Sequence, residues 1–178
     1  NKSFLILPSS STAQAIVYDP AAATSTTQSG SGLPTGPIRA GAFALKLPNG
    51  KFLVALGGSS TTLNIYDPWA STFTASGVPT STAAIGQGAM AIPNADGSFT
   101  ILHGGASTTT SIYDPMRNLI MTGATTTVAI SCGSFAIPRP KQAMYTVAFG
   151  ANAGAAGVTT SSNYDTITKI FAATASSP

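Results

Sequence analysis

Short apolar runs, separated by glycine, proline, asparagine and serine, recur along the whole chain. The run Phe52-Leu53-Val54-Ala55-Leu56 is apolar at every position, whereas a strand with one face in water would alternate with polar residues. This pattern predicts a strand that is covered on both faces. Pro48-Asn49-Gly50 precedes the run and predicts a tight hairpin turn. The chain as a whole therefore predicts a succession of short, paired strands.

The tripeptide Tyr-Asp-Pro marks an internal repeat. It occurs three times, and a fourth, degenerate copy has threonine in place of proline. The four tyrosines lie 48, 47 and 51 residues apart, a period that is typical of propellers and solenoids. The copies are Tyr18-Asp19-Pro20, Tyr66-Asp67-Pro68, Tyr113-Asp114-Pro115 and Tyr164-Asp165-Thr166.

Each repeat predicts four strands in a fixed order. An inner strand with the pattern of Gly41-Ala42-Phe43-Ala44-Leu45 leads through a turn to the second, apolar strand. A loop rich in serine and threonine follows, then a third strand that ends in Tyr-Asp-Pro, and a fourth strand that ends near a glycine. Similar inner segments, 88–92 and 133–137, open the third and fourth repeats. Second strands that are apolar on both faces fit units that pack face to face.

These residues resemble the kelch-like β-propellers, whose repeats run from a glycine pair through a tyrosine to an aromatic residue on the fourth strand. Leu119 or Ile120 stands where the third repeat would have that aromatic residue, and the first repeat has Ser9-Ser10 in place of the glycine pair. The resemblance implies a fold and no particular activity, because the shared residues build the blades. The matching residues are Gly57, Gly58, Tyr66 and Phe73 in the second repeat, and Gly104, Gly105 and Tyr113 in the third.

The repeats predict an all-β fold, a β-propeller of about four four-stranded blades in a single domain, 1–178. Phe4–Leu7 aligns with the second strand, Phe52–Leu56, so the first blade is expected to lack its inner strand. The chain then forms a four-bladed ring with one thin blade, part of a larger ring, or a subunit whose gap a neighbouring strand fills. The blades are predicted at 1–32 (partial), 33–78, 79–124 and 125–178.

The composition argues against helices and against several classes of partner. Ala, Thr, Ser and Gly supply 93 of 178 residues, charged residues make up 7%, and glutamate is absent. A chain without the commonest residue of helix surfaces does not predict an amphipathic helical bundle. The net charge of +3 comes from scattered residues, so no nucleic-acid partner is expected. The longest apolar runs are too short to span a membrane.

Reactive side chains are few, and each has a structural interpretation. His103 stands where the second repeat has Leu56, and one histidine cannot build a metal site or a catalytic triad, so it is interpreted as an inner-strand residue with its hydrogen bonds satisfied. Cys132 has no basic neighbour in the sequence and is expected in the core. The aspartates that follow the repeated tyrosines, and also Asp96, are interpreted as turn residues. We therefore expect no catalytic residue, no metal site, no cofactor and no enzymatic activity.

Serine and threonine cluster between the second and third strands of every repeat. Equivalent loops of a propeller emerge on one face, so that face would carry a ring of hydroxyl groups. We interpret these residues either as neutral loops or as candidate sites for O-glycans and for carbohydrate contact. Asn1-Lys2-Ser3 is a formal N-glycosylation sequon. The candidate loop residues are Ser59, Ser60, Thr61, Thr62, Thr108, Thr109, Thr110, Thr159 and Thr160.

Few charges and a missing inner strand favour packing between copies of the chain. In composition, the chain resembles microbial surface-layer, extracellular fibre and phage-tail proteins. We expect a secreted, non-enzymatic propeller subunit that self-assembles into a filament, tube or surface coat, with Phe4, Leu5, Ile6 and Leu7 as the candidate assembly edge. The alternative is a binding module that recognises a glycan or protein ligand on its Ser/Thr-rich loop face. An enzyme ranks last.

Overall fold

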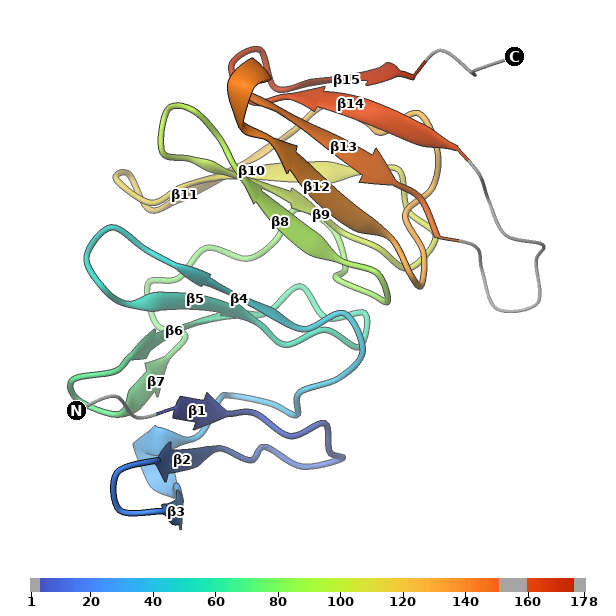
Figure 1. Ribbon diagram of the computed structural model, residues 1–178. Coiled ribbons are helices and arrows are strands. Elements are labelled where there is room, and N and C mark those ends of the chain that lie inside the picture. The colour runs from blue at the N-terminus through green and yellow to red at the C-terminus, as the bar shows by residue number, and fades with distance from the viewer. Residues whose placement is uncertain (1–3, 151–159, 175–178) are drawn as a thin grey trace.

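The computed structural model describes residues 4–150 and 160–174, which form strands joined by turns (Figure 1). The first sheet contains β1 (Phe4–Ile6), β2 (Ile16–Asp19) and β3 (Thr24–Thr27), and the second contains β4 (Phe43–Lys46), β5 (Phe52–Ala55), β6 (Leu63–Asp67) and β7 (Thr72–Thr74). The third contains β8 (Met90–Pro93), β9 (Phe99–Leu102), β10 (Thr110–Asp114) and β11 (Leu119–Thr122), and the fourth contains β12 (Phe135–Arg139), β13 (Met144–Ala148), β14 (Ser161–Asp165) and β15 (Ile170–Ala173). Two 3-10 turns, Gly30–Gly32 and Pro140–Gln142, complete the regular structure of these residues.

The prediction of an all-β fold is confirmed. Every sheet is an antiparallel meander of strands that follow one another in the chain. The first sheet has three strands and each of the others has four. The register agrees with the sequence alignment, because Phe4 pairs with Tyr18 in the first sheet. In the second sheet, Phe52 pairs with Tyr66 in the same way.

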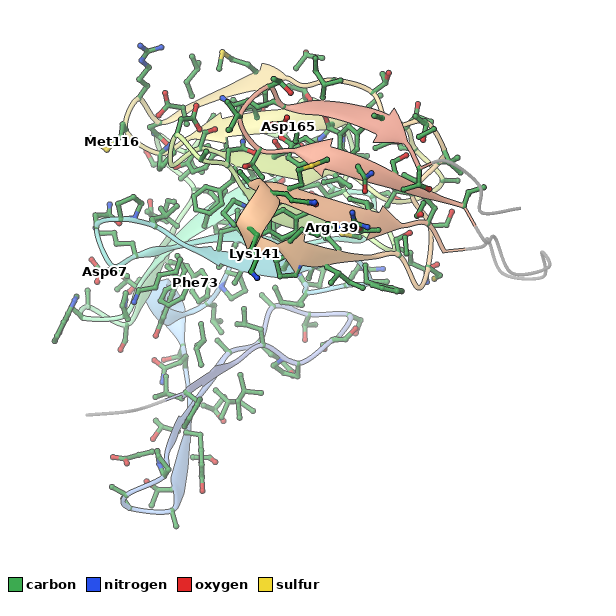
Figure 2. The ribbon with its side chains drawn as sticks, turned by 45° about the horizontal axis from the view of Figure 1, so that its top comes forward. Asp67, Phe73, Met116, Arg139, Lys141 and Asp165 are labelled. Atoms are coloured by element: carbon green, nitrogen blue, oxygen red, sulfur yellow. The ribbon has the colours of Figure 1, made fainter. Side chains whose placement is uncertain are left out.

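The four sheets stand in a row in chain order, with the first and the fourth at opposite ends (Figure 1). Seen from another direction, the first sheet projects away from the other three (Figure 2). Within residues 4–150 and 160–174, the row does not return on itself to close a ring. The sheets therefore have the strand order expected of blades, while ring closure is not observed.

Each inner sheet presents one apolar face to the sheet before it and another to the sheet after it, because side chains alternate along a strand. We call these the N-side face and the C-side face. In the second sheet, the C-side face packs against the third sheet and the N-side face against the first. The C-side face consists of Phe43, Leu45, Leu53, Ala55, Leu63 and Ile65, and the N-side face of Phe52, Val54, Tyr66 and Phe73.

The same kinds of face meet at three junctions, and each junction holds one part of the core. Between the second and third sheets, Leu53 meets Ile101 and Tyr113, all of them 0–1% exposed. Between the third and fourth sheets, Leu102 meets Val147, and both are 0% exposed. Removing such apolar surface from water stabilises the row by roughly 25 cal/mol per Å². The fold is therefore held together by repeated face-to-face packing.

A connecting segment before each inner strand ties adjacent sheets together. Ile85 forms an antiparallel bridge with Ser60 in the loop of the preceding repeat, and Ile130 does the same with Ser107. Both isoleucines are 0% exposed. Each loop between second and third strands therefore supports the start of the next sheet.

The glycine pair ends the second strand of a sheet. There it lies very close to the backbone of the connecting segment that leads into the inner strand of the same sheet. Gly57 has a φ of +72°, and a Cβ atom there would lie 2.6 Å from the Ala40 carbonyl oxygen and from the Ala42 amide nitrogen. Gly104 has the equivalent place in the third sheet, with a φ of +69°. Only glycine accommodates both the backbone conformation and the close approach. The glycine pair is a packing requirement.

Candidate functional site

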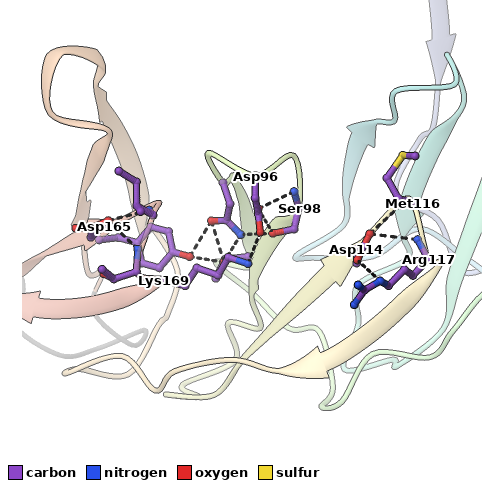
Figure 3. Close-up of polar contacts among 12 residues, drawn as sticks. Asp96, Ser98, Asp114, Met116, Arg117, Asp165 and Lys169 are labelled. Atoms are coloured by element: carbon purple, nitrogen blue, oxygen red, sulfur yellow. Dashed lines mark hydrogen bonds and ion pairs between the residues drawn. The ribbon is translucent and has the colours of Figure 1, made fainter.

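The four Tyr-Asp turns share one hydrogen-bond pattern. One carboxylate oxygen of each aspartate accepts hydrogen bonds from the backbone N–H groups two and three residues further on, at 2.8–3.3 Å. Figure 3 shows this arrangement at Asp114 and Asp165. These bonds lower the pKa of Asp165, because they stabilise its charged form. The aspartates Asp19, Asp67, Asp114 and Asp165 therefore build turns, as the sequence predicts.

The tyrosines of the second to fourth turns are core residues. Tyr113 and Tyr164 are 1% and 0% exposed, and burial raises the pKa of both phenols. The ring of Tyr66 packs on Phe73 with a centroid distance of 4.7 Å, and Tyr164 packs on Phe171 at 4.5 Å. These aromatic pairs fasten the third strand to the fourth across their sheets. None of these three buried tyrosines is therefore exposed as a candidate ligand.

The Ser/Thr loops form turns and hold the connecting segments. The Ser60 hydroxyl accepts a hydrogen bond from the Thr62 N–H at 3.0 Å, and the Thr61 carbonyl accepts one from the Ser81 N–H at 2.9 Å. The third repeat has the same two contacts. Much of the recurring Ser/Thr pattern therefore has a structural role. The third-repeat contacts join Ser107 to Thr109 and Thr108 to Thr126.

The exposure of the other candidate loop residues differs from one to the next. Thr110 is 1% exposed, and its hydroxyl donates to the Ala124 carbonyl oxygen at 2.6 Å, so it is unavailable to a glycan. Thr159 and Asn1-Lys2-Ser3 lie outside the described residues. The hydroxyl-bearing residues that remain exposed are Ser59, Thr61, Thr108, Thr109 and Thr160.

His103 lies in a buried polar cluster just after β9. It is 0% exposed, its Nδ1 lies 2.9 Å from the Thr109 hydroxyl, and its Nε2 lies 2.7 Å from the Ser111 hydroxyl and 3.1 Å from that of Ser81. Burial lowers the pKa of the imidazole, which favours the neutral ring. Both ring nitrogens have partners, so His103 is a hydrogen-bonded core residue, as predicted.

Asp96 belongs to the hairpin turn between β8 and β9 and links the third sheet to the fourth. Its carboxylate accepts hydrogen bonds from the Ser98 hydroxyl at 2.7 Å and from the Lys169 ammonium at 2.6 Å (Figure 3). The hydrogen bond from Lys169 contributes most to lowering the pKa of Asp96 to about 2. The predicted turn role is therefore joined by an ion pair between repeats, which the sequence did not reveal.

The prediction that Cys132 is a core thiol is wrong. Cys132 is exposed, because it lies in the turn that precedes β12 and not in a strand. Its sulfhydryl lies 3.0 Å from the side-chain oxygen of Gln87, the residue at the equivalent position of the third repeat. The two residues contact each other because the starts of consecutive sheets lie side by side.

The described ranges, 4–150 and 160–174, contain no group of three or more His, Cys, Asp or Glu side chains placed to hold a metal ion. No helix in these ranges has the length and apolar character needed to cross a membrane.

A cleft of about 900 Å³ opens between the first and second sheets. Leu5 and Leu7 line it from the first sheet, Phe52 and Val54 line it from the second, and Trp69 beside it is 92% exposed. The inner strands β4 and β8 supply apolar side chains to the junctions that follow them. Within the part of the chain that the structure describes, β1 has no such strand beside it. The cleft therefore lies at the junction that lacks an inner strand.

One recurring contact was missed in the sequence. At each junction, a threonine three residues before the buried isoleucine of the connecting segment bonds to the second residue of a third strand. The repeated Thr-x-x-Ile spacing is a signal that could have revealed it. The pairs are Thr35 with Asn64, Thr82 with Ser111, and Thr127 with Ser162.

No protein-family model and no curated protein matches this sequence. The resemblance to kelch-like propellers therefore rests on the repeat residues themselves.

Proposed function

We propose that this chain is a non-enzymatic extracellular structural protein, built from kelch-like propeller blades, that assembles with copies of itself into a filament, tube or surface coat. One observation carries the proposal: the row of sheets is joined by apolar faces and leaves such faces uncovered at both ends. Phe4 and Ile6 at the first end are 59% and 45% exposed. Phe135 and Ile137 at the other end are each 52% exposed. Exposed apolar side chains that share one face of a strand, as these pairs do, favour an interaction site.

The electrostatics of the chain support close packing between copies. Charged residues are 7% of the sequence, and the net charge of +3 gives little long-range repulsion. The ion pairs of the described residues connect side chains within the chain, for example Lys51 with Asp67 at 3.0 Å. Association through neutral apolar faces is therefore expected to resist salt, because salt screens charges and not apolar contacts.

The second candidate function is a binding module for a glycan or protein ligand on the Ser/Thr-rich loop face. The exposed Thr61 and Thr108, at equivalent places in adjacent repeats, favour it. The hydroxyls of Ser60 and Ser107 are already used within their own turns, so we rank this function second.

Light scattering with negative-stain electron microscopy tests the proposal. Particles larger than the 17.8 kDa chain are expected, their mass rising with protein concentration and persisting at about 1 M salt. A single 17.8 kDa species at every concentration would contradict self-assembly. Binding to a glycan panel that is lost in a T61A/T108A variant would instead support the binding module.

A further inference from the structure

The row ends in two exposed faces of opposite kind, an N-side face on the first sheet and a C-side face on the fourth. We infer that copies of the chain join head to tail: the C-side face of the fourth sheet packs on the N-side face of the first sheet of the next copy. This inference rests on the proposed self-assembly and specifies its contact. Each end has equivalents inside the row, where the same positions are covered by a neighbouring sheet.

The first sheet exposes positions that its equivalents bury completely. Ile6 aligns by register with Val54 of the second sheet, Ile101 of the third and Val147 of the fourth. Those three side chains are 2%, 0% and 0% exposed, whereas Ile6 is 45% exposed. Each of the three is covered by the sheet before it. Ile6 therefore lies on a face that is built for a preceding sheet.

The fourth sheet exposes the opposite half. Ile137 aligns with Ile92, which is 1% exposed in the junction between the third and fourth sheets. It also aligns with Leu45, which packs against the core between the second and third sheets. Ile137 itself is 52% exposed. Together with its neighbour Phe135, it lies on a face that is built for a following sheet.

A polar contact inside the row has matching partners at the two ends. At the junction of the third and fourth sheets, the Thr100 hydroxyl on a C-side face contacts the buried Tyr164 hydroxyl on an N-side face. Thr146 occupies the place of Thr100 in the fourth sheet, and Tyr18 occupies the place of Tyr164 in the first. A second copy in the same geometry brings Thr146 and Tyr18 together, so the polar group on the apolar face also gains a partner.

A second copy supplies the matching face, and the contact joins unlike faces. The first and fourth sheets lie at opposite ends of the row, so their outer faces do not meet within the described residues of one copy (Figure 1). Two identical faces would not reproduce an internal junction, which always joins a C-side face to an N-side face. A contact between unlike faces is heterologous, and it extends to a filament or closes to a ring of copies.

Two variants that each block one end test the inference. I6E places a carboxylate on the N-side face of the first sheet, and I137E places one on the C-side face of the fourth. Each variant alone is expected to remain a 17.8 kDa monomer, because one half of every contact is blocked. Mixed in equal amounts, they are expected to form a dimer of twice 17.8 kDa and nothing larger. I167E, at a turn position that is 68% exposed, is the matched control and should assemble like the parent chain.

The possible results separate the contact from the function. If the parent assembles and either variant alone still forms dimers or larger particles, the head-to-tail contact is wrong and self-assembly stands. If the parent itself stays monomeric at every concentration, the proposed function and the contact both fail. Circular dichroism checks that each variant is folded. If a glutamate variant does not fold, the serine variant at the same position, I6S or I137S, is used in its place.

Discussion

The first and third sheets show how much of this fold comes from a repeat and how much from its neighbours. Both are antiparallel meanders with a phenylalanine and a tyrosine paired across adjacent strands and an aspartate turn at the end of a strand. In the third sheet, Ile101 is 0% exposed, but the equivalent Ile6 of the first is 45% exposed. The repeat sequence therefore specifies the meander, while burial depends on a sheet on either side.

The two sheets also differ in how they approach the sheet that follows. In the third sheet, Gly104 and Gly105 lie against residues 86–89, which lead into its own inner strand, and Ser107 forms an antiparallel bridge with Ile130 of the following connecting segment. The first sheet has Ser9-Ser10 at the glycine pair, and Ser9 pairs with Ile38 in parallel. Within the described residues β1 has no inner strand beside it, so the close approach that requires glycine in the third sheet has no counterpart there. The cleft between the first and second sheets lies at the junction with this parallel bridge.

The largest predicted difference is in the free energy of unfolding, between substitutions at equivalent positions of the two sheets. Ile101→Ala should lower the free energy of unfolding by about 2–5 kcal/mol, because it leaves a cavity in a closed junction. Ile6→Ala should lower it by less than about 1 kcal/mol, because its side chain is already partly in water. Urea unfolding of both variants measures this. Equal losses would show that Ile6 is also enclosed.

The next effect concerns the glycine pair. Gly57→Ala should cost about 2–4 kcal/mol of unfolding free energy, since it adds backbone strain and a clash with the connecting segment. Gly50→Ala is the matched control: its φ is +82°, but no atom lies within 4 Å of the added Cβ. That change should cost only about 1–2 kcal/mol. Similar losses for the two variants, measured by urea unfolding, would remove the close approach as the reason for the pair.

A pH effect is expected from His103 in the third sheet. Its folded-state pKa lies below the ordinary value of 6.5, so the unfolded chain binds a proton more readily as the pH falls. The free energy of unfolding should therefore decrease from pH 7 to pH 5, by at most about 1.4 kcal/mol per pH unit. H103L copies the leucine of the second repeat and should lose this part of the pH dependence. An unchanged slope in that variant would assign the effect to other groups.

The smallest effect concerns the aspartate turn, which is common to all sheets. The residue four positions after each aspartate has a left-handed φ, which is +50° at Asn118 of the third sheet and +52° at Ala23 of the first. Asparagine tolerates this conformation better than alanine. Ala23→Asn should therefore raise the thermal midpoint slightly. A lower midpoint for this variant in calorimetry would contradict the turn geometry. Asn118→Ala is not a matched test, because it would also remove the hydrogen bonds of Asn118 with the Tyr113 hydroxyl and the Gly77 carbonyl.

The sequence predicted the features that depend on neighbouring residues in the chain. Strand order followed from apolar runs between turn signals, and the aspartate turns followed from Asx chemistry. The sequence left open whether Leu119 or Ile120 takes the place of the aromatic residue on the fourth strand. The strand pairing resolves this, because Ile120 lies opposite Tyr113.

Features that depend on the placement of one sheet against another were out of reach. The exposure of Cys132 and the ion pair of Asp96 with Lys169 arise between repeats. Whether a row of sheets closes into a ring depends on the angles between sheets. A pattern of residues within one repeat does not fix those angles.

Electron cryomicroscopy of the assembled protein would show the contact between copies. We expect one uninterrupted series of sheets, in which the fourth sheet of each copy is followed by the first sheet of the next, with Ile137 facing Ile6 across the contact. A map in which two fourth sheets or two first sheets face each other, or in which single copies stand alone, would contradict this arrangement.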